Sequence, residues 1–178
     1  MRICLVGNLN SIHMQRFIRF FMDKDQHDVH IITSSPMAIL WLSFQNDLVN
    51  VHPHLIGKHG SRSPFNFLWK MIQTRRIIKS IYPDVVHAHY AFGPGTFAAF
   101  SGFHPFVLST WGSDILIDTG SFWKRLLIRY ALRKADAVTC EDRFVKDRLL
   151  NLGVKEDRVK PFNFGVDCTR FKPSRMSS

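Results

Sequence analysis

The sequence predicts one α/β domain, a doubly wound and mostly parallel β-sheet with helices on both faces. Two observations support this prediction. Short apolar runs rich in β-branched residues alternate with longer amphipathic segments along all 178 residues, as in repeated strand–helix–strand units. Several runs are almost continuously apolar, as strands covered on both faces are. No repeat or linker interrupts the alternation, so we expect residues 1–178 to form a single domain.

Four strands and three helices are expected in the first half of the chain. The strands occupy residues 2–6, 28–33, 49–53 and 85–89, and Pro53 places the third near an edge of the sheet. The first helix begins at a cap on Asn10 or Ser11 and runs to about residue 24, and the others occupy residues 36–44 and 65–82. The helix at 65–82 should bury an apolar stripe, made of Phe65, Leu68, Ile72, Ile77, Ile78 and Ile81. Residues 56–64 are expected to form an exposed basic loop.

The second half continues the alternation. Strands are expected at residues 106–110, 136–140 and 159–162. A helix of small residues should begin at the Gly-Pro-Gly sequence of residues 93–95, and a basic helix should follow at 121–135. A last helix at 143–152 should end at Gly153, because glycine readily adopts the left-handed conformation of a helix C-cap.

Charge and composition narrow the classes of partner. Lys and Arg number 24 against 14 Asp and Glu, a net charge of +10 that favours phosphate ligands, nucleic acid or anionic lipid headgroups. No apolar stretch is long enough to cross a bilayer, and the first apolar run is too short for a signal peptide. The three cysteines, Cys4, Cys140 and Cys168, lack a metal-like spacing and indicate a reducing cytosol. We therefore expect a soluble cytoplasmic domain that can contact a membrane surface.

Polar residues follow four of the expected strands, at residues 7–13, 87–90, 109–114 and 140–142. In a parallel sheet the carboxyl ends of the strands lie at one edge, where ligands bind. The helix after Gly7 offers backbone donors to an anion, but the sequence there lacks the G-x-G-x-x-G spacing of a dinucleotide site. No G-x-S-x-G hydrolase motif is present either. These four segments are therefore the candidate site.

Two histidines and the turn at residues 111–114 each have a structural and a functional interpretation. From strand alternation we expect His87 and His89 to face opposite sides of the sheet, with His87 hydrogen-bonded in the core and His89 nearer the site. No set of residues with zinc-ligand spacing accompanies them, so no metal site is expected. At residues 111–114, Gly112 and Asp114 could simply form a turn and cap the next helix. Their alternative role is ligand binding.

An ordered set of segments resembles the N-terminal half of family 4 glycosyltransferases, which have the GT-B fold and use nucleotide-activated sugars with retention of configuration. The segments lie at residues 24–29, 83–89, 109–114, 135–142, 152–154, 163–167 and 170–173. The resemblance implies a Rossmann-like domain that binds the acceptor, facing a second domain that binds the nucleotide-sugar donor. The paired-glutamate motif of that second domain has no counterpart in this chain, so the chain alone is expected to be inactive. No cofactor is implied besides the donor substrate, and no catalytic residue can be assigned.

The resemblance also suggests site residues. The Gly7-Asn8 turn would approach the donor phosphate or the acceptor, although many relatives have a second glycine where Asn8 stands. Trp111 occupies a position where the family often has a histidine that contacts the transferring sugar, and indole can stack on a sugar but cannot act as a base. The full set of expected substrate-binding residues is Gly7, Asn8, His13, His89, Tyr90, Trp111, Gly112, Asp114 and Glu141.

Two wider expectations remain. Relatives that act on lipid-linked acceptors often dock on membranes, and Phe65, Phe67 and Trp69 lie among basic residues of the helix at 65–82. A core stripe with a solvated basic face explains the same pattern. The alternative function is a non-catalytic module that binds a sugar or an anionic ligand and acts through a partner chain. Nucleic acid is an unfavoured ligand because no helix-turn-helix, RNP or zinc-finger signature is present.

Overall fold

A computed structural model of the chain describes residues 1–22, 27–36, 50–61, 63–162, 165 and 168. Within them, seven strands form one sheet in the order β3-β2-β1-β4-β5-β6-β7, and every neighbouring pair is parallel. The strands are β1 Arg2–Val6, β2 Asp28–Thr33, β3 Val51–Leu55, β4 Val85–His89, β5 Phe106–Ser109, β6 Ala137–Cys140 and β7 Val159–Pro161. The predicted doubly wound parallel sheet is confirmed, with β3 at an edge as expected.

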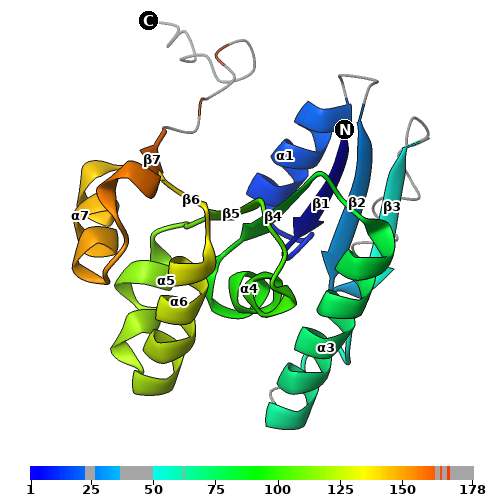
Figure 1. Cartoon of the computed structure of the whole chain (residues 1–178), viewed down its shortest axis with the longest axis horizontal. Coiled ribbons are helices and arrows are strands. Elements are labelled where there is room, and N and C mark those ends of the chain that lie inside the picture. The colour runs from blue at the N-terminus through cyan, green and yellow to red at the C-terminus, as the bar shows by residue number, and fades with distance from the viewer. Residues whose placement is uncertain (23–26, 37–49, 62, 163–164, 166–167, 169–178) are drawn as a thin grey trace, which may run out of the picture.

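Helices cover both faces of the sheet (Figure 1). Helix α1 lies on one face, while α3, α4 and α6 lie on the other. The α-helices among the described residues are α1 Ile12–Met22, α3 Pro64–Ile81, α4 Thr96–Ser101, α5 Ser113–Leu116, α6 Phe122–Lys134 and α7 Arg143–Asn151. None of them combines the length and apolar composition needed to cross a bilayer. The helix predicted at 36–44 lies, apart from Pro36, outside the described residues.

The core follows from the alternation of side chains along each strand. In β1, Ile3 and Leu5 face α1 and pack in a cluster with Met14 and Ile18. The intervening β1 side chains belong to the larger cluster under α3, α4 and α6, whose buried members include Cys4, Val6, Val86, Ala88, Ile78, Phe97, Leu108 and Ile128. Because both faces are covered, the central strands are apolar at nearly every position, which explains the continuous runs in the sequence.

The apolar stripe predicted to be buried on helix α3 is only partly buried. The structure buries Thr74, Ile78 and Ile81, but Phe65 is 84% exposed and Leu68 is 50% exposed. The N-terminal turns of α3 extend away from the strands (Figure 1), so only the C-terminal half of the predicted stripe reaches the sheet. Helical spacing shows which residues share a face, but not how far along the helix that face is covered.

The segment after β4 also differs from the prediction. Residues Ala91–Gly95 form an irregular turn in which Phe92 and Gly93 have non-helical backbone angles, so α4 begins at Thr96 rather than at residue 93. A β-carbon on Gly95 would lie 2.8 Å from Leu108 Cδ1 and 3.0 Å from the Tyr90 carbonyl oxygen. Glycine is therefore required by close packing of this turn against β5.

Candidate functional site

A cavity of about 450 Å³ lies beyond the carboxyl ends of β1, β4 and β5. The strand order reverses between β1 and β4, so the cavity occupies the topological switch point where doubly wound sheets bind ligands. Its volume is in the range of small-molecule sites. The lining residues are Asn8, Ser11, His13, Met14, His89, Tyr90, Pro94, Trp111 and Ser113. Three of the four predicted strand-end segments therefore converge on one cavity.

His87 and His89 lie on the same side of the sheet, with ring centroids 4.2 Å apart. The expectation that they face opposite sides is wrong, because residues two apart in a strand share a face. Both rings pack against Phe17 of α1, at centroid distances of 5.3 and 4.5 Å. The two histidines and α1 thus form one wall of the site.

The two histidines differ in their hydrogen bonds. His87 Nε2 lies 2.7 Å from Ser109 Oγ, and that same Oγ accepts a hydrogen bond from the Thr139 hydroxyl at 2.7 Å. Burial lowers the pKa of His87 to about 4, so the ring is neutral at pH 7. His87 Nε2 and Ser109 Oγ are therefore hydrogen-bonded, with the donor set by the tautomer of the neutral ring. The predicted hydrogen-bonded core role of His87 is confirmed.

His89 is 2% exposed, and both of its ring nitrogens are buried without a hydrogen-bond partner among the described residues. Burial, and then the neighbouring His87 and His13, hold its pKa well below the ordinary value, so the ring is neutral. A neutral imidazole has one donor and one acceptor, and leaving both unused costs free energy. His89 lines the cavity, so its two unpaired nitrogens lie at the cavity wall.

Aromatic side chains shape the rest of the cavity. The ring of His13 meets that of Trp111 edge-on at 4.3 Å, and Trp111 lies 5.8 Å from His89. Gly7 lies behind this wall, where a β-carbon would be 3.1 Å from Met14 Sδ and 3.3 Å from His89 Cβ. Gly7 and Asn8 also line an adjacent cavity of about 310 Å³ toward α3. Asn8 therefore borders both cavities.

Tyr90 occupies a strained backbone position at the end of β4. Its φ of 85° is in a region that residues other than glycine rarely adopt. The phenol donates a hydrogen bond to Asp118 Oδ2 at 2.9 Å, and the Ser113 hydroxyl donates to the phenol oxygen at 3.4 Å. Partial burial is the main cause of the raised pKa of Tyr90. The ring is thus fixed at the cavity edge as a neutral donor and acceptor.

Asp114 is fully buried and does not line the cavity. Its carboxylate accepts hydrogen bonds from the backbone N–H groups of Ala91 at 2.7 Å and Trp111 at 3.0 Å, joining the turns that follow β4 and β5. Burial raises its pKa to about 6. Gly112, with a φ of 76°, provides the left-handed turn that brings Asp114 back toward Trp111. The turn expected as the alternative at Gly112 is observed, but the expected capping role of Asp114 is wrong, because Asp114 lies inside α5 and its carboxylate joins two turns instead.

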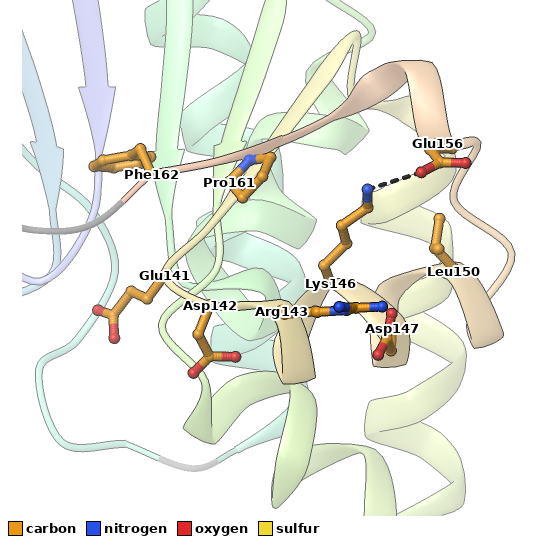
Figure 2. A pocket seen from close by; sticks show the side chains of 9 residues that line it. All are labelled: Glu141, Asp142, Arg143, Lys146, Asp147, Leu150, Glu156, Pro161 and Phe162. Carbon is orange, nitrogen blue, oxygen red and sulfur yellow. Dashed lines mark hydrogen bonds and ion pairs between the residues drawn. The ribbon is translucent and has the colours of Figure 1, made fainter.

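Glu141 lies in a different groove of about 500 Å³, between α7 and the end of β7 (Figure 2). Figure 2 shows the Glu141 and Asp142 carboxylates pointing away from the Lys146–Glu156 ion pair, whose atoms are 2.8 Å apart. Asp142 caps α7 by accepting from the Val145 N–H at 2.8 Å. The fourth predicted segment is therefore not brought into the cavity that contains His89.

Four lining residues are not in the expected substrate-binding set: Ser11 and Ser113 lie inside predicted candidate segments, whereas Met14 and Pro94 lie outside them. Each of the four lies within a few positions of an expected substrate-binding residue. Nearness to a strand end was therefore the sequence feature that could have indicated them. Their types carry no distinctive chemistry, which is why pattern alone did not select them.

Comparison with known proteins identifies the family. Residues 2–142 match the family described as Glycosyl transferase 4-like. The chain is 30% identical over 181 aligned residues to an uncharacterized glycosyltransferase of Methanocaldococcus jannaschii, an alignment that includes 93% of this chain and 49% of the relative. The chain thus spans about half the length of this curated relative.

Solved structures share the fold. A Rickettsia africae glycosyltransferase has a TM-score of 0.67 at 19% identity, covering 99% of this chain and 46% of that one. Anabaena HepE, solved in complex with UDP and glucose, has a TM-score of 0.67 at 15% identity, with coverage of 98% and 47%. The UDP-GlcNAc 2-epimerase of Methanocaldococcus jannaschii has a TM-score of 0.68 at 15% identity, with coverage of 90% and 45%. The sheet is therefore a Rossmann-like half of a GT-B fold, and the chain belongs to the glycosyl transferase 4-like family.

Proposed function

We propose that this chain forms the acceptor side of a glycosyltransferase cleft, for retaining transfer of a sugar from a nucleotide-sugar donor to a lipid or polysaccharide acceptor. The observation that carries the proposal is His89, a buried imidazole that lines the switch-point cavity with both ring nitrogens unpaired among the described residues. Two hydroxyl groups of a sugar would satisfy these atoms, one donating to the unprotonated nitrogen and the other accepting from the ring N–H. Hydroxyl recognition by paired polar atoms is how such a site would select a sugar.

The neighbouring side chains suit a sugar ring. The Trp111 indole offers an apolar face for the C–H groups of a pyranose, and Tyr90 and Ser113 offer hydroxyl groups at the same edge. We assign His89 a positioning role rather than that of a general base, because its pKa lies well below 6.5 and it is a weak proton acceptor at pH 7. Proton removal from the acceptor would then fall to the leaving phosphate of the donor.

The donor half is assigned to a second domain or a partner chain. Anabaena HepE, whose structure contains UDP and glucose, is matched over 47% of its length. We therefore expect no transferase activity from residues 1–178 alone, since these residues show no paired-glutamate motif. Sugar transfer or donor hydrolysis by the purified 178-residue chain would contradict this part of the proposal. A non-catalytic sugar-binding module is the alternative, and the family match does not favour it.

The binding test follows the indole N–H resonance of Trp111 by NMR. Addition of a methyl glycoside at millimolar concentration should shift this resonance, which a Trp111→Phe variant identifies by its disappearance. The His89→Phe variant should bind the same glycoside at least about tenfold more weakly, because it loses hydrogen bonds to the sugar. The proposal fails if methyl glycosides of the common hexoses leave the resonance unmoved, or if they act equally on wild type and His89→Phe.

A membrane surface is proposed as the place where a lipid-linked acceptor meets this domain. Phe65 is 84% exposed and Trp69 is 47% exposed on the first turns of α3, and the guanidinium carbon of Arg76 lies 6.0 Å from the Trp69 ring centroid. Exposed aromatic and basic side chains together favour an anionic interface. Phe67 does not contribute, because it packs against Phe97 at a centroid distance of 4.9 Å.

A further inference from the structure

A second cluster of ionisable side chains lies at the opposite edge of the sheet from the cavity. Asp28 and His30 belong to the start of β2, and His52 belongs to the neighbouring edge strand β3. His30 and His52 are direct partners in the parallel register, and Asp28 precedes His30 by two positions, so the three side chains share one face. One potential ligand atom from each lies within 4.8 Å of the other two.

The distances within this cluster fit a shared metal ion. Asp28 Oδ1 is 3.3 Å from His30 Nε2 and 3.2 Å from His52 Nε2. In a tetrahedral zinc site with bonds of about 2.0–2.1 Å, two ligand atoms are separated by about 3.3 Å. Asp28 Oδ1 is also buried, and no hydrogen bond of acceptable geometry reaches it from the described residues. The oxygen is thus placed between two imidazole nitrogens with a lone pair unused.

The surrounding side chains orient these atoms in the manner of metal sites. Arg2 Nε donates to Asp28 Oδ2 at 2.8 Å, which leaves Oδ1 facing the histidines. His30 Nδ1 lies 3.0 Å from His54 Nε2, and the two rings stack with an interplanar angle of 16°. If His30 donates its Nδ1–H to His54, its Nε2 carries the lone pair that a metal requires. Outer partners of this kind commonly fix the tautomer of a ligating histidine.

The charge state of the cluster is compatible with binding. Burial is the main cause that lowers the pKa of both His30 and His54. Neighbouring Arg2 holds the pKa of Asp28 below its usual value and keeps the carboxylate ionised. The side chain of His52 is half exposed, which gives an ion access from solvent. The positive charge of Arg2 repels a cation, but Arg2 is hydrogen-bonded to Asp28 Oδ2 and not to the Oδ1 atom that faces the histidines.

We propose that Asp28, His30 and His52 bind one divalent transition-metal ion, with zinc as the best fit. Two imidazole nitrogens and one carboxylate oxygen are a ligand set that zinc accepts, whereas calcium and magnesium prefer oxygen alone. The fourth tetrahedral position would hold water or an exogenous ligand. The ion would also link the edge strand β3 to β2, so its binding should raise the melting temperature.

The test uses the 178-residue chain, stripped with a chelator, in a Cys168→Ser background so that the exposed thiol cannot bind metal. Titration with Co²⁺ should give one equivalent with the d–d absorption of a tetrahedral site and no thiolate charge-transfer band, and Zn²⁺ should displace it. His52→Gln and Asp28→Asn should each weaken Zn²⁺ binding by about 100-fold or more, and His54→Gln by about 10-fold. His52→Gln is the primary variant, because a half-exposed side chain can be replaced without disturbing the core.

The control is His104→Gln, which removes the histidine of another His–Asp pair, 2.8 Å apart and exposed. It should leave the Zn²⁺ affinity and the Co²⁺ spectrum unchanged. Circular dichroism checks that each variant is folded. The proposal is overturned if no Co²⁺ spectrum develops, if His52→Gln binds as tightly as the parent, or if His104→Gln is the variant that loses binding. In the first case the cluster is a hydrogen-bonded His–Asp group without a metal.

Discussion

His89 is held in a conformation that is costly for the unliganded chain. Its ring is 2% exposed, and neither nitrogen has a hydrogen-bond partner among the described residues. We predict that His89→Phe unfolds at the same temperature as wild type or higher, because an apolar ring of similar shape removes the unsatisfied atoms. Thermal unfolding followed by circular dichroism measures this. Binding sites often contain groups that lower stability because function requires them.

His87→Phe is the matched comparison on the same face of β4. It breaks the 2.7 Å hydrogen bond to Ser109 and should lower the free energy of unfolding by about 1–3 kcal/mol. At about 2–4 °C per kcal/mol for a chain of this size, the melting temperature should fall measurably. If His89→Phe lost as much stability as His87→Phe, then His89 would be an ordinary packed histidine and the functional argument would fall.

Asp114 predicts a specific pH dependence of stability. Burial raises its pKa from 3.8 to about 6. A carboxyl group with a raised pKa in the folded state contributes stability that is fully present below pH 3.8 and is lost as the pH rises through 6. The free energy of unfolding of wild type, minus that of Asp114→Asn, should therefore fall by about 3 kcal/mol between pH 3.8 and pH 7, which is about 1.4 kcal/mol for each unit by which the pKa is raised.

Denaturant unfolding of both proteins across this range measures the difference, and the other titrating groups cancel because they are common to the two. A difference that stayed constant or grew with pH would show that the hydrogen bonds from Ala91 and Trp111 outweigh the cost of burial. Asp114 would then be better described as a stabilised anion.

At the scale of single residues, the sequence indicated which strand ends carry the site but not what each side chain does there. His89, Tyr90 and Trp111 stand at the carboxyl ends of strands and do line the cavity. Asp114 stands in the same stretch, yet its carboxylate faces backbone N–H groups. That orientation depends on the turn after β4, which is distant in sequence. The Asp28–His30–His52 cluster was not predicted, for a related reason. Its members come from two strands, and the register between the strands cannot be read from the sequence of either strand alone.

At the scale of elements, α3 combines a buried C-terminal half with an exposed N-terminal half. We predict that Phe65→Ser changes the free energy of unfolding by no more than about 0.5 kcal/mol, because the ring is 84% exposed. Ile78→Ala should cost about 2–5 kcal/mol, because that side chain is 1% exposed in the core. Urea unfolding of both variants measures these changes. Equal losses of unfolding free energy would mean that the apolar stripe is buried along the whole of α3, as the sequence predicted.

Strands and long helices were predictable because burial on one or two faces leaves a periodic pattern. The short helix Ser113–Leu116 was not, since four residues cannot show helical periodicity. The irregular turn at residues Ala91–Gly95 was also missed, because its shape is set by packing of Gly95 against Leu108 rather than by local preference. These two elements flank the cavity, so the parts of the fold that form the site are those that local patterns describe least.

At the scale of the whole molecule, the two proposed sites lie at opposite edges of the sheet. The carboxyl edge holds the cavity at the reversal of strand order, and the amino edge holds the Asp28–His30–His52 cluster. The two sites share no residue, so they can be tested independently. Loss of metal binding should leave glycoside binding unchanged, and His89→Phe should leave the Co²⁺ spectrum unchanged.

The net charge of +10 is a property of the whole molecule, and it predicts attraction to anionic lipid. We expect the chain to bind vesicles that contain phosphatidylglycerol more strongly than neutral phosphatidylcholine vesicles, as measured by co-sedimentation. Raising the salt concentration from about 0.01 M to about 1 M shortens the Debye length from about 30 Å to about 3 Å, so binding should weaken steeply.

The position of the contact is resolved by paired variants with the same kind of change. Phe65→Ser combined with Trp69→Ser removes the exposed aromatic pair of α3, and Phe122→Ser combined with Trp123→Ser removes a pair on α6 that is 73% and 72% exposed. The α3 pair should reduce vesicle binding severalfold, because apolar insertion adds to the electrostatic attraction, while the α6 pair should have little effect. The reverse result would move the contact to α6. Equal recovery of wild type with neutral and anionic vesicles would remove the membrane from the proposed function, while leaving the sugar cavity as it stands.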